Sequence, residues 1–144
     1  MKKLLMVAVA ILGLTAAGSA AVVPRFIRAG DVSVTVTYTG KGTVDDTHEI
    51  LVFLFDHAVP TDGSMPLAMQ TTTKSGGTVV FKDVPVSPVY ITMVYDEQAN
   101  YAGDAPPPPG APIGSYQKDG KAIPVTPEPD AKIKVSFDDS VRWK

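Results

Sequence analysis

The sequence contains no cysteine, and this absence excludes several kinds of protein at once. Without cysteine the chain forms no disulfide, has no thiolate metal site, and lacks the residue that anchors a bacterial lipoprotein through a thioether. Histidine is also scarce, with two among 144 residues, and the formal net charge is only -2. A polyanion-binding protein normally carries a basic surface, so we expect no nucleic-acid partner.

The first twenty residues have the pattern of an export signal. Residues 1–3 carry two lysines, residues 4–17 form an apolar stretch, and residues 18–21 are small. The alternative, a membrane anchor, needs about 20 apolar residues, and no later segment approaches that length. We predict cleavage near Ala20 or Ala21 and a periplasmic or secreted product without a membrane span. Loss of the two lysines changes the net charge from -2 to -4.

The chain beyond the signal has the composition of a turn-rich β domain, because all 13 prolines lie in it. After a short tether at 21–30 we expect one domain at 31–144. Strict alternation over 32–38 predicts a half-buried strand, and residues 48–56, apolar on both parities, predict a central strand covered on both faces. Further strands are predicted at 67–73, 78–82, 89–95, 121–125 and 131–137, with a turn at 75–77 joining the first two as a hairpin.

These strands predict an all-β fold, a two-sheet antiparallel β-sandwich of about seven strands (prealbumin- or immunoglobulin-like) preceded by the helical signal peptide. Phe81 is expected in the core between the sheets. On the strand at 89–95 the inward parity is expected to be Val89, Ile91 and Met93, because the other parity carries Thr92.

Residues 77–85, Gly-Thr-Val-Val-Phe-Lys-Asp-Val-Pro, are followed by Pro88, Val89 and Tyr90. This run resembles the signature of carboxypeptidase-regulatory-like and transthyretin-like (prealbumin-type) β-sandwich domains. Residues 94–100, Val-Tyr-Asp-Glu-Gln-Ala-Asn, carry a closer resemblance to a group of uncharacterised secreted bacterial domains, in which the strand at 89–95 continues into an Asp-Glu-Asn-type loop. Pro88 stands where the family usually has glycine. The resemblance covers roughly residues 31–141 and implies the sandwich fold, with Tyr90 and Val94 facing inward.

No group of residues predicts catalysis. His48 and His57 are nine residues apart and therefore have opposite parity along one strand, which argues against a shared metal site. The iron ligands of intradiol dioxygenases, which share the prealbumin-type fold, would require both histidines. There is no Gly-x-Ser-x-Gly motif and no cysteine nucleophile. We therefore expect a protein that is not an enzyme and has no cofactor.

Two kinds of binding residue stand in the irregular segment 96–120. Asp96, Asn100 and Asp104 place oxygens at positions 1, 5 and 9 of a calcium-loop pattern, which lacks its glycine and its final glutamate, so a solvated acidic turn is the alternative. Tyr101 and Tyr116 flank the proline-rich part of the segment and are candidates for a ligand-binding surface. The alternative is that both tyrosines pack the loop onto the sheet.

Two main functions fit this sequence. The first is a non-catalytic binding or accessory domain of the bacterial envelope, with its recognition surface on the 96–120 loop and an envelope protein or a glycan as partner. The second is a structural protein that self-associates or pairs with a partner through an exposed edge strand, for which residues 31–39, without proline or lysine, are the candidate. An accessory domain of a carbohydrate-acting enzyme is a third. The sequence predicts no oligomeric state.

Overall fold

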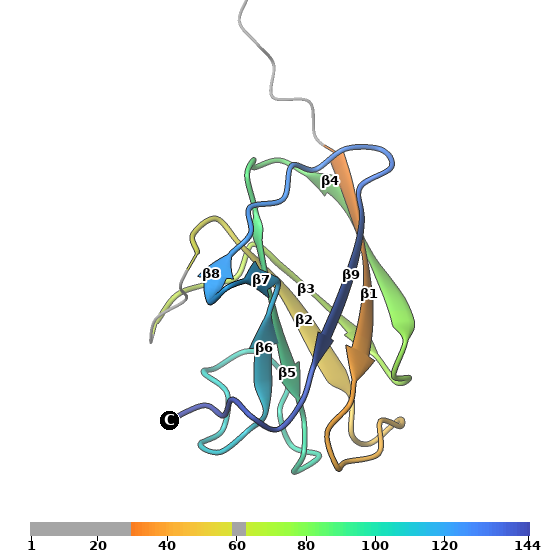
Figure 1. The fold of residues 1–144 in the computed structure, drawn as a ribbon, viewed down its shortest axis with the longest axis vertical. Helices are drawn as coiled ribbons and strands as arrows, with labels where there is room; N and C mark the ends of the chain where they lie inside the picture. Colours follow the sequence, from red (N-terminus) through yellow and green to blue (C-terminus); the bar gives the residue numbers. More distant parts are fainter. Residues whose placement is uncertain (1–29, 59–62) are drawn as a thin grey trace, which may run out of the picture.

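The computed structural model describes residues 30–58 and 63–144, which contain nine strands and no helix (Figure 1). Within these ranges, therefore, no helix is long and apolar enough to cross a membrane. The predicted signal peptide and tether fall almost entirely outside the described residues. The strands are β1 (Gly30–Tyr38), β2 (Ile50–Phe55), β3 (Ala68–Thr72), β4 (Gly77–Val84), β5 (Tyr90–Tyr95), β6 (Ile113–Ser115), β7 (Gln117–Lys118), β8 (Lys121–Ala122) and β9 (Lys132–Phe137).

The strands form two main sheets around a common core (Figure 1). The three-stranded sheet has the order β4-β1-β9, the four-stranded sheet has the order β3-β2-β5-β6, and β7 and β8 form a small ribbon. The all-β prediction is confirmed. The strand number exceeds the expected seven because β6 and β7 lie inside the segment predicted to be irregular, and strands of two or three residues are too short to show alternation.

One pairing departs from the antiparallel arrangement predicted for the whole sandwich. Strand β1 pairs antiparallel with β4 but parallel with β9, where Val34 lies opposite Ile133. A parallel pair needs a long connection between its strands, and here the connection comprises most of the domain. The first and last strands of the described chain are therefore neighbours in the three-stranded sheet.

Two predictions of strand position are wrong. The 31–39 segment is not an edge strand, because β1 lies between β4 and β9. The turn after β3 does not close a hairpin either, since β3 pairs with β2 and β4 pairs with β1, in the other sheet. The N–H of Gly76 in this turn donates to the carbonyl of Val36, 2.7 Å away. The turn thus connects the two sheets, and the backbone of β4 pairs with β1 instead of β3.

The four-stranded sheet is buried on both faces along β2, as predicted. Ile50, Val52 and Leu54 belong to the core between the sheets, whereas the alternate residues Leu51 and Phe53 belong to a second apolar cluster on the outer face. Alternating side chains of a strand point to opposite faces, so both faces of β2 must be covered.

The predicted inward parity of β5 is confirmed, because Val89, Ile91 and Met93 lie in the core with Phe81. The inward position that the family resemblance implies for Val94 is wrong: Val94 is buried in the outer cluster. Tyr90 is only half-buried. The segment after β5 covers the outer face and explains how Val94 is buried there.

Candidate binding pocket

The loop from Asp96 to the start of β6 is fixed at its root by Asp96, a buried carboxylate. Its two oxygens accept the backbone N–H groups of Asn100, at 3.2 Å, and Tyr101, at 3.0 Å. The Asp96 N–H donates to the carbonyl of Glu49 at 2.9 Å, which ties the loop to the residue before β2. The aspartate therefore supplies acceptors that a tight loop turn needs for its own backbone.

Tyr101 and Gly103 bring this loop onto the outer face of the sheet. The ring of Tyr101 lies 6.3 Å from the ring of Phe53, and its hydroxyl donates to the carbonyl of Ala105 at 2.8 Å. Gly103 has a φ of +81°, and a Cβ at this position would lie 2.2 Å from Sδ of Met69. The positive φ favours glycine here, and any larger residue would have to displace the Met69 side chain.

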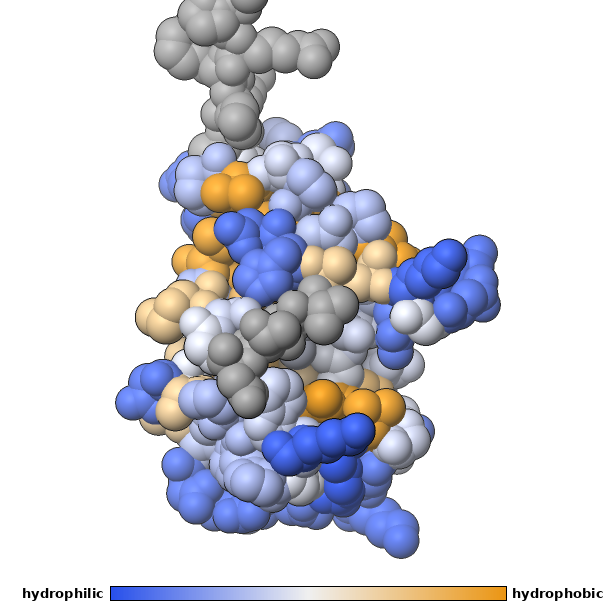
Figure 2. All heavy atoms as spheres, turned by 90° about the vertical axis from the view of Figure 1, so that its left-hand side faces the viewer, coloured by the Kyte–Doolittle hydropathy of each residue, from blue (hydrophilic) through white to orange (hydrophobic). Residues whose placement is uncertain are grey.

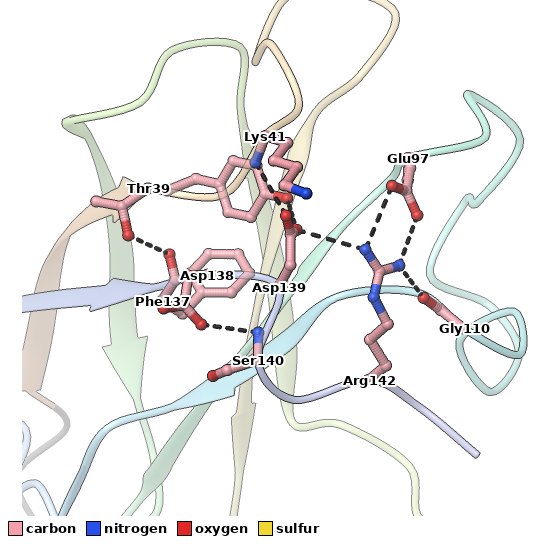
Figure 3. Close-up of polar contacts among 10 residues, drawn as sticks. Thr39, Lys41, Glu97, Gly110, Phe137, Asp138, Asp139, Ser140 and Arg142 are labelled. Atoms are coloured by element: carbon pink, nitrogen blue, oxygen red, sulfur yellow. Dashed lines mark hydrogen bonds and ion pairs between the residues drawn. The ribbon is translucent and has the colours of Figure 1, made fainter.

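The last residues of the chain hold the far end of the loop. The Trp143 N–H donates to the carbonyl of Ala111 at 2.9 Å, and the Trp143 carbonyl accepts the N–H of Gly110 at 2.8 Å. The Arg142 guanidinium donates to the Gly110 carbonyl at 2.6 Å and to the Glu97 carboxylate at 2.8 Å (Figure 3). This C-terminal segment, residues 139–143, therefore acts as a clamp on the loop.

Asp139 connects this clamp to the first strand. Its carboxylate accepts the Tyr38 hydroxyl and, at 2.9 Å, the Lys41 N–H, and it lies 3.6 Å from Arg142. The hydrogen bond from Tyr38 and the one from Lys41 lower the pKa of Asp139 below its usual value. Burial, with the Asp139 hydrogen bond second, raises the pKa of Tyr38 above 10.0. The Tyr38 ring stacks on Tyr95 with centroids 4.3 Å apart.

The loop and the clamp enclose a pocket of about 220 Å³ on the outer face of the four-stranded sheet. Strands β2 and β5 form its floor, residues 63–66 line one side, and Tyr101 with residues 103–107 line the other. Ile113 and Trp143 complete the lining. Figure 2 turns this side of the molecule toward the viewer and shows hydrophobic areas separated by hydrophilic residues.

Asp104 is the only charged side chain among the described residues that line the pocket. Burial raises the pKa of Tyr101 to about 12, and the negative charge of Asp104 adds to this increase. Asp104 and Tyr101 both line the pocket, so its wall carries one carboxylate beside an aromatic hydroxyl. The rest of the lining is largely apolar and aromatic.

A hydrogen-bonded chain of polar side chains lies at one end of the pocket. Nδ1 of His57 is 2.5 Å from the Asp56 carboxylate, and Nε2 of His57 is 3.1 Å from the hydroxyl of Ser64, a lining residue. This arrangement was not predicted from the sequence, because the serine stands outside any nucleophile motif. His48, by contrast, contacts Asp45 in the turn before β2, so the two histidines are at opposite ends of that strand.

The residues predicted as binding sites do not form one surface. Tyr101 and Asp104 line the pocket, whereas Tyr116 packs against the core between the sheets. Asn100 is exposed, and the Asp96 oxygens accept backbone N–H groups. Nowhere in residues 30–58 and 63–144 do three or more histidine, cysteine, aspartate or glutamate side chains gather as metal ligands.

Phe55 and Trp143 were not predicted as site residues. Phe55 is indistinguishable in sequence from the apolar residues that build the core. Trp143 is the only tryptophan in the sequence, and nothing else in its surroundings indicated a binding role.

Strand β3 is an outer strand of its sheet and carries an apolar row at and before its start. Met65, Leu67 and Met69 are exposed by 81%, 39% and 37%. No other described strand pairs with the far edge of β3. The predicted edge strand at 31–39 is internal to its sheet, whereas β3, which was not predicted as an edge, is one.

Comparison of the chain with known protein families, with characterised proteins and with solved structures found no match.

Proposed function

We propose that this protein is a non-catalytic binding domain of the bacterial envelope, exported through a cleaved signal peptide, and that it recognises its ligand in the pocket under the 96–112 loop. The observation that carries the proposal is the pocket itself. A concave, mainly apolar site with a few polar groups is the usual form of a ligand site. The loop is fixed at both ends, by Asp96 and by the C-terminal clamp, so the pocket is preformed.

The lining favours an apolar group over a free sugar as the ligand. Ser64, Thr92 and Asp104 are the polar side chains that line it, and the remaining contacts come from apolar side chains, prolines and glycines. Sugar hydroxyls that leave water need hydrogen-bond partners in the site, and burial without them is costly. An apolar or aromatic group, from a partner protein or a small molecule, loses no such bonds.

In this proposed function the hydrogen-bonded chain of Asp56, His57 and Ser64 has a structural role and does not catalyse hydrolysis. In serine hydrolases the aspartate is buried, so that it can hold and stabilise the charged histidine. Here the side chains of His57 and Asp56 are 43% and 56% exposed, and water weakens their interaction. An assay with p-nitrophenyl acetate tests this point: the mature protein and Ser64→Ala should hydrolyse the ester at the same rate. Loss of activity in Ser64→Ala would identify an esterase.

A prealbumin-type sandwich is part of the same proposal. It is supported by Phe81, which lies in the core, and by the Asp83-Val84-Pro85 run that follows it. Asp83 has a φ of +51° beside an irregularity in the β1–β4 register, and its N–H donates to Asp31. An aspartate at this position is consistent with the Asn-or-Asp preference of the resembling families, because these residues tolerate a positive φ.

A peptide and glycan array probed with the mature domain tests the proposed function, with two loop variants to locate the site. Ala105→Trp should fill the pocket and abolish binding, because Ala105 lines it. Ala102→Trp is the matched control, since Ala102 is an exposed residue of the same loop outside the lining. Binding that persists in Ala105→Trp would place recognition elsewhere.

Self-association through β3 is the second candidate function, favoured by its uncharged edge and by the exposed Met65, Leu67 and Met69. Strand edges without charge or proline are prone to pair with other chains. Sedimentation measurements should then show a concentration-dependent dimer that Gln70→Lys prevents. The control is Val80→Lys on β4, an outer strand of the other sheet. A monomer at all concentrations would exclude this function.

A further inference from the structure

Four of the residues that line the pocket are aromatic. Phe53 and Phe55 come from β2, Tyr101 from the loop and Trp143 from the C-terminal segment. The Phe53 ring centroid lies 6.3 Å from that of Phe55 and 6.3 Å from that of Tyr101. A cation is attracted to the face of an aromatic ring when it lies within about 6 Å of the ring centroid. A positive group among these residues is therefore within reach of more than one ring.

The charge of the pocket also favours a cationic ligand. Asp104 contributes a carboxylate, and no lysine or arginine is found among the described lining residues. An anionic ligand would meet this negative charge without a compensating base, whereas a cation would be attracted by it. The exported chain as a whole also carries more acidic than basic residues. Aromatic rings together with a single carboxylate are the chemistry that recognises organic cations.

We propose that the pocket binds an alkylammonium group, and a quaternary ammonium in preference to a primary one. The inference rests on the proposed function, namely that this pocket is the ligand site. The methyl groups of a quaternary ammonium pack against Phe53, Phe55 and Val94 on the floor, while its charge is attracted by the ring faces and by Asp104. A primary ammonium is strongly hydrated, so it loses more solvation energy on entering an apolar pocket.

The same cation occurs free, as in choline or glycine betaine, and in the headgroup of choline lipids. The pocket recognises the ammonium group that these ligands share. Glycine betaine differs in carrying a carboxylate close to the cation, which Asp104 repels. Free choline and vesicles of phosphatidylcholine therefore distinguish the two sources, with phosphatidylglycerol vesicles as the control for non-specific adsorption.

The experiment is a titration of the isotopically labelled mature protein with choline, followed by NMR, and a parallel titration with 3,3-dimethyl-1-butanol. This alcohol is the neutral isostere of choline. We expect choline to shift the signals of Tyr101, Gly103 and the Trp143 indole, and the alcohol to bind about tenfold more weakly, which corresponds to about 1.4 kcal/mol. Raising the salt concentration should weaken choline binding.

Matched variants measure separately how much the charge of Asp104 and the aromatic ring of Tyr101 contribute to choline binding. Asp104→Asn should weaken choline binding several-fold and leave binding of the neutral alcohol unchanged, whereas Asp119→Asn, an exposed aspartate outside the lining, should change neither. Tyr101→Phe keeps the ring and should retain binding, while Tyr101→Leu should lose it. Both variants are expected to stay folded, which the NMR spectrum reports directly.

The outcomes are distinguishable. Equal binding of choline and its neutral isostere, with no effect of Asp104→Asn, would overturn the ammonium site but leave the pocket as a site for apolar groups. Binding to phosphatidylcholine vesicles alone would support the site and assign it to a lipid headgroup. If neither choline nor any array ligand perturbs the pocket signals, the proposed function fails together with this inference.

Discussion

Nη1 of Arg142 lies 2.8 Å from Oε2 of Glu97, although the two residues are 45 positions apart. Glu97 stands at the start of the long loop, and the same Nη1 also donates to the carbonyl of Gly110 near its end. One guanidinium therefore holds both ends of the loop that forms the pocket wall (Figure 3).

Removing this guanidinium should loosen the loop more than it affects global stability. The ion pair is partly exposed, and exposed pairs contribute little to overall stability. In Arg142→Ala we expect several-fold faster amide hydrogen exchange at Gly110, Ala111 and Ile113, with the denaturation midpoint nearly unchanged. Lys118→Ala, an exposed cation on the small ribbon, is the control. Unchanged exchange in Arg142→Ala would mean that the Trp143 backbone bonds hold the loop alone.

Truncation of Ile91 should cost more stability than truncation of Val94. Ile91 lies between the two sheets, where Ile→Ala substitutions cost about 2 to 5 kcal/mol. Val94→Ala removes fewer methyl groups, at about 0.8 kcal/mol each, from the outer cluster. Urea denaturation of both variants measures the difference. A larger loss for Val94→Ala would show that the outer cluster is the more tightly packed of the two.

Gly114→Ala should destabilise the domain by about 1 to 3 kcal/mol through overpacking. A Cβ at Gly114 would lie 2.4 Å from Cβ of Phe137, at the side where β6 of one sheet approaches β9 of the other. Thermal denaturation measures the loss, and Ser115→Ala on the same strand is the control. A wild-type midpoint for Gly114→Ala would mean that the two sheets separate here at little cost.

Stability should decline at alkaline pH in a way that depends on Tyr38. Because burial and Asp139 raise the pKa of Tyr38, the folded state keeps the proton more tightly than the unfolded state. The stabilisation is thus complete below pH 10.0, the ordinary tyrosine value, and is lost as the pH rises above it. Tyr38→Phe should have a lower midpoint at neutral pH and a smaller decline as the pH rises above 10.0. A parallel decline in both proteins would assign the alkaline effect to other tyrosines.

The stabilisation contributed by Asp139, which accepts the Tyr38 hydroxyl, depends on pH in the opposite direction. The lowered pKa of Asp139 gives a stabilisation that is present above 3.8, its ordinary value, and is lost as the pH falls below that value. Asp139→Asn should therefore reduce stability at neutral pH and flatten its loss in acid, measured by thermal denaturation across the acid range.

Calcium should change the melting temperature by less than about two degrees between chelator and millimolar calcium. The Asp96 carboxylate already accepts two backbone N–H groups, and Asp104 lines the pocket instead. Scanning calorimetry measures the change. A large increase that is absent in Asp104→Asn would establish a calcium-ordered loop.

The sequence predicted those features that depend on local alternation. β2 was identified as doubly covered because it is apolar on both parities, and the inward parity of β5 followed from Thr92. The position of β1 could not be predicted in this way, because its neighbours β4 and β9 are distant in sequence and their identity depends on long-range pairing.

The pocket was predictable only in part for the same reason. Tyr101 was predicted as a ligand-binding residue because it flanks the proline-rich loop, whereas Asp104 was predicted only as a calcium ligand, from its spacing. Phe55 and Trp143 reach the same site from a strand and from the end of the chain, and only the folded arrangement brings them there. Tyr116 flanks the same proline-rich loop as Tyr101, yet packs against the core between the sheets.

The parallel pairing of β1 with β9 has a consequence for the order in which the strands become available as the chain is synthesised. β1 emerges first, with a row of valines and one side of its backbone unpaired until residues 132–137 follow. Such a strand is an open template for wrong partners, and folds governed by contacts between distant residues form slowly. The interval between the arrival of the two ends is therefore when this chain is most exposed to proteases and to aggregation, and a chaperone that held the first strand would protect it for that time.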